Sequence, residues 1–246
     1  MNIFDSILLG AIQGLTEFLP VSSSAHLSIV QSLIPHFSQP GLLFDVIIHM
    51  GTTLAVLIFF RKKILSISMR EAFLLGIATI PAVLFGLLFR EILEGMFRDI
   101  HSTGWQLVLT GVLNFLVVFS VTRSKKIDVL DSLLIGVAQA IAIVPGISRS
   151  GATIFTGVKL GIDKKRVAEF SFLMSVPAIV GANVLELYSH RSSLGSVDIS
   201  YFAGFVTAFI VGFISIGFLM KIISEKSYLV FAVYCVVLGL LTVALL

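Results

Sequence analysis

The sequence predicts an all-α polytopic membrane protein, built as an inverted repeat of a re-entrant helical hairpin plus three transmembrane helices, with six spans and two re-entrant hairpins in all. The chain is 57% hydrophobic and 13% charged, with a mean hydropathy of +1.06. Several uncharged runs are long enough to cross a hydrocarbon layer roughly 30 Å thick. The pattern of the first half returns after a shift of 126 residues, which predicts a duplicated unit.

The first predicted element is a hairpin of two short apolar runs. Residues 3–19 carry Asp5, Gln13 and Glu17 and stop at Pro20, and residues 21–34 stop at Pro35. Neither run makes a comfortable span, but together they fit two half-helices that enter and leave the membrane on one side, buried by protein on their flanks. Three spans are expected to follow, at 42–60, 72–89 and 104–121.

The second half repeats this order of a hairpin and three spans. Seven of twenty aligned positions in the hairpin are identical, and several are polar, so apolar composition alone does not explain the match. Asp5, Ser6, Leu8, Gly10, Gln13, Ser22 and Ser24 align with Asp131, Ser132, Leu134, Gly136, Gln139, Ser148 and Ser150.

We therefore predict a single membrane domain over residues 1–246, with a first inverted repeat at 1–126 and a second at 127–246. The spans of the second repeat are expected at 167–187, 201–220 and 228–246. The segments near 90–103 and 188–200 are expected to be ordinary connections.

The distribution of basic residues predicts the orientation. Three crossings per repeat put the second half into the membrane upside down relative to the first. One face then holds thirteen basic residues against Arg90, Arg98 and Arg191 on the other, so the richer face is expected to be cytoplasmic. Both termini and the site opening then face outward from a cytoplasmic (inner) membrane. The thirteen are Arg61, Lys62, Lys63, Arg70, Arg123, Lys125, Lys126, Lys159, Lys164, Lys165, Arg166, Lys221 and Lys226.

This distribution also bears on partners. The sequence pI is about 9.1, which in a soluble protein can indicate nucleic-acid binding. Here the basic residues lie in short loops between apolar segments, as the positive-inside rule expects. We therefore expect the bilayer as a partner and no nucleic acid, and we leave a homodimer open.

Two polar stretches are the candidate site. They are Glu17-Phe-Leu-Pro-Val-Ser-Ser-Ser-Ala-His26 and Pro145-Gly-Ile-Ser-Arg-Ser-Gly-Ala-Thr153, each a turn between two apolar runs. Polar backbone at membrane depth belongs around a cavity. The repeat is most informative where it fails, since Glu17, Ser23 and His26 align with Ile143, Arg149 and Ala152. One half thus carries a carboxylate and an imidazole and the other a guanidinium, which predicts an acid/base side and an anion-binding side.

Arg149 is the most informative single residue. A cation near the bilayer centre costs about 2.5 to 3.5 kcal/mol on insertion scales, so a counter-charge is expected. Pairing with Glu17 is one explanation. A phosphate or carboxylate ligand fits better, because a planar guanidinium, neighbouring hydroxyls and a half-helix N-terminus all favour an anion. The predicted substrate-binding hydroxyls are Ser22, Ser24, Ser148, Ser150 and Thr153.

The first stretch supplies the candidate chemistry. His26 follows Ser23 by three residues, so a helix places the two on one face. The imidazole and hydroxyl are then a base and nucleophile pair, or the ring itself attacks phosphorus; spacing does not choose between these. A packed histidine is the plain alternative, which we expect for His49 and His190.

Glu17 either caps or pairs locally, binds a divalent cation, Mg²⁺ or Ca²⁺, or orients a water. Gln13, one turn earlier, offers a neutral oxygen to the same ion, and Asp45 is either a further carboxylate or a residue at the end of a span.

These stretches resemble the signatures of the undecaprenyl pyrophosphate phosphatase family, also called bacitracin-resistance proteins. The first reads Gln13-Gly-Leu-Thr-Glu17-Phe-Leu-Pro-Val-Ser-Ser-Ser-Ala-His26 here, and the resemblance covers nearly the whole chain. It implies a metal-dependent membrane hydrolase that removes the terminal phosphate of a C55 polyprenyl pyrophosphate and so recycles the lipid carrier of cell-wall assembly.

The resemblance also implies roles for individual residues. Glu17 takes the place of the catalytic or metal-binding glutamate, and Ser23 and His26 match the proposed nucleophile and base. Ser148, Arg149 and Thr153 match the pyrophosphate-binding signature. Gln13 departs from the pattern, since many members have glutamate there, and so a two-carboxylate metal site is not expected in this chain.

A transporter or flippase of a lipid-linked or small anion is the alternative function, because inverted repeats with broken helices are common among transporters. A carrier needs anion-binding groups but has no need of a nucleophile beside a base. Ser23 and His26 therefore favour a phosphatase.

Overall fold

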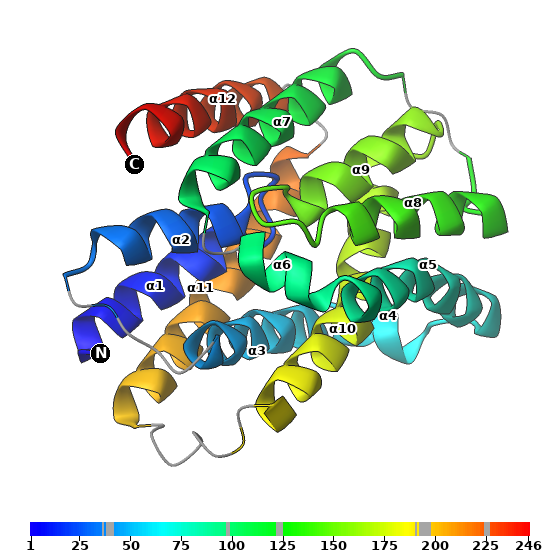
Figure 1. Cartoon of the computed structure of the whole chain (residues 1–246). Helices are drawn as coiled ribbons and strands as arrows, with labels where there is room; N and C mark the ends of the chain where they lie inside the picture. The colour runs from blue at the N-terminus through cyan, green and yellow to red at the C-terminus, as the bar shows by residue number, and fades with distance from the viewer. Residues whose placement is uncertain are drawn as a thin grey trace.

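The computed structural model describes residues 1–35, 37, 42–96, 99–121, 125–189, 191, 198–223 and 227–246, and the regular elements in these ranges are helices (Figure 1). His190, Arg98, Arg123 and Lys226, which the sequence singled out, lie outside them. The helices are α1 (Ile3–Thr16), α2 (Ser23–Leu33), α3 (Leu43–Phe59), α4 (Arg61–Leu65), α5 (Met69–Leu88), α6 (Arg90–Met96), α7 (Ile100–Val118), α8 (Val129–Ile141), α9 (Arg149–Lys159), α10 (Lys164–Ser189), α11 (Ile199–Ile222) and α12 (Ser227–Leu245).

The chain is a multi-pass membrane protein. Among the described residues, four helices are long and apolar enough to cross a membrane, namely α5, α10, α11 and the part of α12 from Tyr228 to Leu245. Shorter apolar helices are α1, α3 and α8. The predicted set of six spans adds α3 and α7 to these four, and that finer count stays a prediction.

The segment 90–103 is not the ordinary connection that the sequence predicted. Residues Arg90–Met96 form helix α6, and α7 already begins at Ile100. The physical reason for the early start is a cap, since the Asp99 carboxylate accepts a hydrogen bond from the backbone N–H of Ser102. The span predicted at 72–89 likewise begins earlier, at Met69, where Ser68 and Glu71 form a capping box.

Helices α1 and α8 begin in similar ways. At α1, Asn2 accepts from the backbone N–H of Asp5, and the Ser6 hydroxyl donates to the carbonyl of Asn2. At α8, Asp128 accepts from the N–H of Asp131, and the Ser132 hydroxyl donates to the carbonyl of Asp128, as the shift of 126 residues requires.

Helix packing follows the same shift, with partners exchanged between the halves. α1 packs against α11, and its counterpart α8 packs against α5, the counterpart of α11 (Figure 1). A Cβ added to Gly10 would collide with the carbonyl of Gly204, and one added to Gly136 would collide with that of Ala78. Close approach of helix backbones through small residues is typical of membrane interfaces. The helices α7 and α12 pair with each other.

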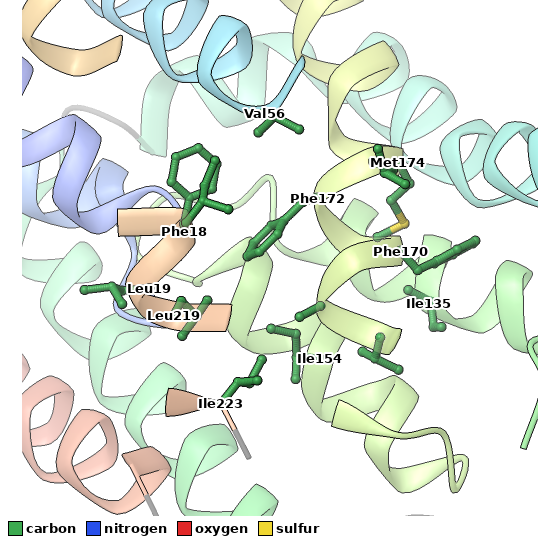
Figure 2. Close-up of a cluster of buried hydrophobic side chains, with 14 of the residues drawn as sticks. Phe18, Leu19, Val56, Ile135, Ile154, Phe170, Phe172, Met174, Leu219 and Ile223 are labelled. Atoms are coloured by element: carbon green, nitrogen blue, oxygen red, sulfur yellow. The ribbon is translucent and has the colours of Figure 1, made fainter. Parts of the chain in front are cut away.

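A buried aromatic contact fixes the turn of the first hairpin. Phe18 and Phe172 of α10 meet edge to face, with ring centroids 5.4 Å apart, and both side chains are almost fully buried. Figure 2 shows them in the main hydrophobic cluster, with Val56, Leu219 and Ile154 nearby. Since Phe18 follows Glu17 directly, this packing holds the candidate carboxylate in place.

Candidate active site

The two polar stretches lie together, as the sequence predicted. The hydroxyl of Ser150 donates to the carbonyl of Leu19 (3.0 Å), and the backbone N–H of Gly146 donates to Ser24 Oγ (3.2 Å). From α7, the Asn114 amide donates to the carbonyl of Pro20 at 2.6 Å. These hydrogen bonds give partners to backbone groups in the two turns that have none within a helix. They also join the two hairpins into one site.

Glu17 and Arg149 form an ion pair across the two halves. Arg149 Nη2 donates to Glu17 Oε1, and the side chains are 14% and 6% exposed, respectively. The pairing considered for Arg149 from sequence is thus confirmed for one nitrogen. The other, Nη1, is buried and has no hydrogen-bond partner among the described residues. A buried guanidinium nitrogen without an acceptor is costly, and an anionic ligand would supply one.

The second oxygen of Glu17 accepts hydrogen bonds from two residues and lies near a third. Oε2 accepts from Ser23 Oγ at 2.7 Å and from Gln13 Nε2 at 3.1 Å. His49 Nε2 lies 3.7 Å away. Because His49 Nδ1 donates to the Asp45 carbonyl (2.7 Å), Nε2 carries a proton only when the ring is charged, and only then is this contact an ion pair.

His49 was expected to be an ordinary packed histidine, and the structure places it at the site instead. The sequence signal was its position on the span 42–60, where an imidazole at membrane depth needs a partner. Asp45, considered as a further carboxylate, accepts from Gln31 Nε2 at 2.7 Å. The described contacts place it near His49 and not in contact with Glu17.

Gln13 has one free oxygen. Its Nε2 donates to Glu17 and to Thr52 Oγ1 (3.3 Å). A carboxylate only accepts, so the amide nitrogen must face Glu17. Gln13 Oε1 is then a buried acceptor without a partner among the described residues, and it is the kind of atom that a hard cation binds.

His26 is held by both ring nitrogens. Nδ1 donates to the carbonyl of Ser22 at 2.7 Å, which leaves Nε2 as the acceptor of a 2.7 Å hydrogen bond from the Tyr234 hydroxyl. The two rings stack, 12° from parallel with centroids 5.6 Å apart. Long side chains in a helix point back toward its N-terminus, so His26 reaches the carbonyl one turn earlier. The structure therefore pairs Ser23 with Glu17, and the predicted hydrogen bond between Ser23 and His26 is not formed.

Ser22 caps α2 from a strained backbone conformation. Its φ is +66°, in the left-handed region, and it is the only non-glycine residue there in the described part of the chain. Such a conformation costs on the order of 1–3 kcal/mol and persists only where its surroundings enforce it. Here it aims the Ser22 carbonyl at His26. The Ser22 hydroxyl lies 3.1 Å from Ser24 Oγ.

The hydroxyls predicted on the anion-binding side take part in internal bonds. Ser148 Oγ accepts from the N–H of Gly151 (3.1 Å) and lies 3.2 Å from Ser150 Oγ. Thr153 is fully buried, and its hydroxyl lies 2.7 Å from Ser171 Oγ on α10. Thr153 therefore contacts α10, while Ser148 and Ser150 adjoin the turn.

A cavity of about 250 Å³ opens beside this cluster between α2, α3 and α10. Ser24, Asp45 and His49 line it. His49, whose Nε2 lies 3.7 Å from Glu17 Oε2, is the lining residue that connects the cavity to the buried cluster.

Tyr234 and Asn114 are site residues that sequence reasoning missed. Tyr234 lies inside the apolar run 228–246, and a phenol at membrane depth usually needs a hydrogen-bond partner. That signal was present in the sequence. The partner, His26, is 208 residues away along the chain, and no local pattern points to it.

The fold and this cluster define a membrane protein whose buried carboxylate, guanidinium and imidazole lie beside a small cavity that His49 and Ser24 line. The chain matches the family described as "Bacitracin resistance protein BacA" over residues 6–241, and it belongs to that family.

Curated relatives share most of its length. A protein of Christiangramia forsetii named undecaprenyl-diphosphatase is 42% identical, with 98% of this chain and 97% of the relative covered. One of the same name from Syntrophotalea carbinolica is 42% identical over 97% of each chain. Another, from Caldicellulosiruptor bescii, is 39% identical over 95% of this chain and 94% of its own.

Proposed function

We propose that this chain is an integral membrane phosphatase that hydrolyses undecaprenyl (polyprenyl) pyrophosphate to the monophosphate and inorganic phosphate, recycling the lipid carrier of cell-wall glycan assembly. Family membership and the names of the relatives support the reaction. The observation that carries it is the Arg149 guanidinium, paired on one nitrogen with Glu17 and unpartnered on the other among the described residues. A pyrophosphate oxygen supplies the missing acceptor.

The geometry favours Ser23 as the nucleophile and Glu17 as its base. Ser23 Oγ donates to Glu17 Oε2 at 2.7 Å, within reach for proton transfer. Attack of Oγ on the terminal phosphorus forms an O–P bond, breaks the bridging P–O bond and releases polyprenyl monophosphate. His26, neutral and with its Nε2 lone pair available once Tyr234 turns away, then takes a proton from the water that hydrolyses the phosphoserine. Direct attack by His26 is the alternative.

Pyrophosphate binding also rearranges the charges around Glu17. Arg149 can direct both nitrogens at phosphate oxygens, since a guanidinium binds phosphate in a bidentate manner. The carboxylate oxygen that Arg149 held is then free. Ser24 borders the cavity, and Ser22, Ser148 and Ser150 surround the same turns as proposed substrate-binding residues. We expect Thr153 to contribute less to substrate binding, because its hydroxyl already contacts Ser171.

We propose Mg²⁺ or Ca²⁺ as the cofactor. Within the described ranges no group of three His, Cys, Asp or Glu side chains is arranged to hold a metal ion. Glu17 and the unpartnered Gln13 Oε1 fit a cation that the pyrophosphate helps to bind. A bound cation would neutralise charge that develops on the phosphate oxygens.

We further propose that the two halves are inverted repeats whose hairpins are re-entrant, in the cytoplasmic membrane with both termini and the cavity facing outward. The exchanged packing of α1 with α11 and of α8 with α5 supports the two-fold relation. Helices α2 and α9 have 11 residues each, or roughly 17 Å, which is too short to cross. A cysteine at position 37 should react with an impermeant reagent from outside, and one at 126 only after lysis; the reverse pattern would refute this orientation.

The proposed function is tested by phosphate release from a polyprenyl pyrophosphate by the purified chain, with and without a chelator. Glu17→Gln should abolish release, and added metal should not restore it. Asp5→Asn removes a carboxylate from the same helix outside the cluster, so it should retain activity. No release by the unmodified chain, or equal activity of the two variants, would contradict the proposal. A transporter, the alternative function, would bind the lipid without releasing phosphate.

A further inference from the structure

A second, larger cavity lies apart from the Glu17 and Arg149 cluster and shares no residue with it. Its volume is about 540 Å³, and it lies where α4, α5, the start of α8 and the start of α10 meet. Figure 1 shows α5 and α8 side by side here. Four cations line it, Lys63, Arg70, Lys126 and Arg166, all on the face predicted to be cytoplasmic.

Only one of these cations is neutralised. Lys63 Nζ lies 2.8 Å from a carboxylate oxygen of Glu71 and 3.9 Å from one of Glu169, the two acidic residues in the cavity wall. Within the described part of the chain, Arg70, Lys126 and Arg166 have no carboxylate within 4 Å. Arg70 and Arg166 contact only backbone carbonyls, at 3.4 and 3.2 Å. Four cations and two carboxylates leave the cavity with an excess of positive charge.

The backbone around the cavity does not supply binding groups, because its helix starts are already capped. Glu71 and Ser68 cap α5, and Asp128 and Asp131 cap α8. Asp163 accepts from the backbone N–H groups of Lys165 and Arg166 at the start of α10. Recognition of an anion therefore falls to the unpaired cationic side chains.

The floor of the cavity is apolar. Leu74, Phe170 and Leu173 line it and are 4%, 8% and 7% exposed, respectively. α5 and α10 are both candidate membrane spans. The cavity lies near the N-terminal end of each of these helices. A cationic rim over an apolar floor at that level matches a lipid headgroup with the first carbons of its tail.

We propose that this cavity is a second binding site, for the phosphate headgroup of an anionic membrane lipid, on the face opposite the proposed catalytic opening. Arg70, Lys126 and Arg166 bind the phosphate oxygens, and Leu74 and Phe170 contact the start of the tail. Lys63 stays paired with its two glutamates. The site is independent of the proposed hydrolysis, because none of these residues belongs to the Glu17 and Arg149 cluster.

The test measures binding of dioctanoyl phosphatidic acid to the full chain in zwitterionic nanodiscs, with dioctanoyl phosphatidylcholine and inorganic phosphate as comparison probes. The variant Arg70→Gln with Lys126→Gln removes two unpaired cations from the cavity. Its affinity for phosphatidic acid should fall about thirtyfold. Lys62→Gln with Lys165→Gln removes two exposed cations of the same face that do not line the cavity, and its affinity should change less than about twofold.

Single variants guard against a folding effect. Arg166→Gln should lose about fivefold and Arg166→Lys should retain affinity, since the latter keeps the charge. Phosphate release should be unchanged in all of these variants. Equal losses in the two double variants would overturn the proposal, because only diffuse surface charge would then be acting. Binding of inorganic phosphate as tight as that of phosphatidic acid, and as sensitive to the variants, would overturn the lipid as ligand in favour of the free anion.

Discussion

The two hairpins share a frame and differ in the groups that they carry. Both begin with a side-chain cap, Asn2 in the first and Asp128 in the second. Both also place two serines beside each other at the start of the second helix, with hydroxyl oxygens 3.1 Å apart in the first hairpin and 3.2 Å in the second. On that frame one hairpin holds Glu17 and His26 and the other holds Arg149. Because the ion pair joins the halves, neither hairpin alone makes the site.

The backbone differs at the equivalent serines. Ser22 has φ +66°, whereas Ser148 has φ −67°, and in the second hairpin the left-handed conformation falls on Gly146, at φ +93°. Glycine adopts this conformation without strain and serine does not. The hairpin that carries the imidazole thus carries the strain as well, which indicates that the position of the Ser22 carbonyl matters to His26.

The largest expected effect is on the contact between the hairpins. Arg149→Ala should lower kcat/KM by about 10³-fold, since it removes an anion-binding donor and leaves Glu17 without its partner. Substrate binding should weaken as well. Arg149→Lys keeps the charge but loses the planar guanidinium, so its kcat/KM should lie between those of the unmodified chain and Arg149→Ala. Steady-state phosphate release measures both, and an alanine variant with more than about a tenth of normal kcat/KM would contradict this assignment.

His26→Ala should come next, with kcat lowered about 10²-fold and substrate binding largely kept, as for a residue that acts in proton transfer. Equilibrium binding of the pyrophosphate lipid, measured beside turnover, separates the two quantities. Near-normal turnover would make His26 a packing residue.

Tyr234→Phe should have a smaller effect, a loss of about five- to tenfold in kcat, because the ring loses the hydrogen bond that positions it before Nε2 is released for proton transfer. The pH profile of kcat should shift with it, which a merely structural change would not cause. Tyr228→Phe is the matched control on the same helix. The Tyr228 hydroxyl is buried without a partner in the described structure, so its removal should leave kcat unchanged.

Gln13→Glu tests the metal proposal. A carboxylate one turn from Glu17 attracts a shared cation more strongly than an amide does, so activity should reach half its maximum at severalfold lower Mg²⁺ or Ca²⁺. Gln139→Glu makes the same change at the equivalent position of the other hairpin and should not alter the metal dependence. An unchanged titration for Gln13→Glu would mean that position 13 does not face the ion.

The smallest effect concerns stability. Gln139 is buried, and neither its amide nitrogen nor its oxygen has a partner among the described residues, whereas the nitrogen of Gln13 has two. Gln139→Leu should therefore stabilise the fold by about 1 kcal/mol, a rise in Tm of roughly 2–4 °C. Gln13→Leu should lower the Tm, because the hydrogen bonds of the Gln13 nitrogen are lost. Thermal unfolding in one detergent compares the two, and destabilisation by Gln139→Leu would indicate an unseen polar partner.

Local pattern predicted most of the helices and the pairing of the polar stretches. Hydropathy and the positions of proline predicted where the apolar runs lie, and the 126-residue shift predicted which segments of the two halves correspond. Both can be read from the order of residues along the chain. Helix α6 was missed, since its segment is neither long nor strongly apolar. Contacts between distant segments were missed as well. Nothing near His26 indicates Tyr234, and the spacing that suggested a Ser23 and His26 pair did not include the left-handed backbone at Ser22.

The close approach of Gly10 to Gly204 has a consequence for the order of assembly. Gly10 and Gly14 of α1 lie against α11, so the glycine face of α1 is covered only after residues 199–222 have been synthesised. In the other half the order is reversed, because α5 precedes its partner α8. During synthesis, the second hairpin can therefore pack against α5, which has already been made. The first hairpin can pack against α11 only after residues 199–222 have left the ribosome. The Glu17 side of the site is thus completed late in synthesis.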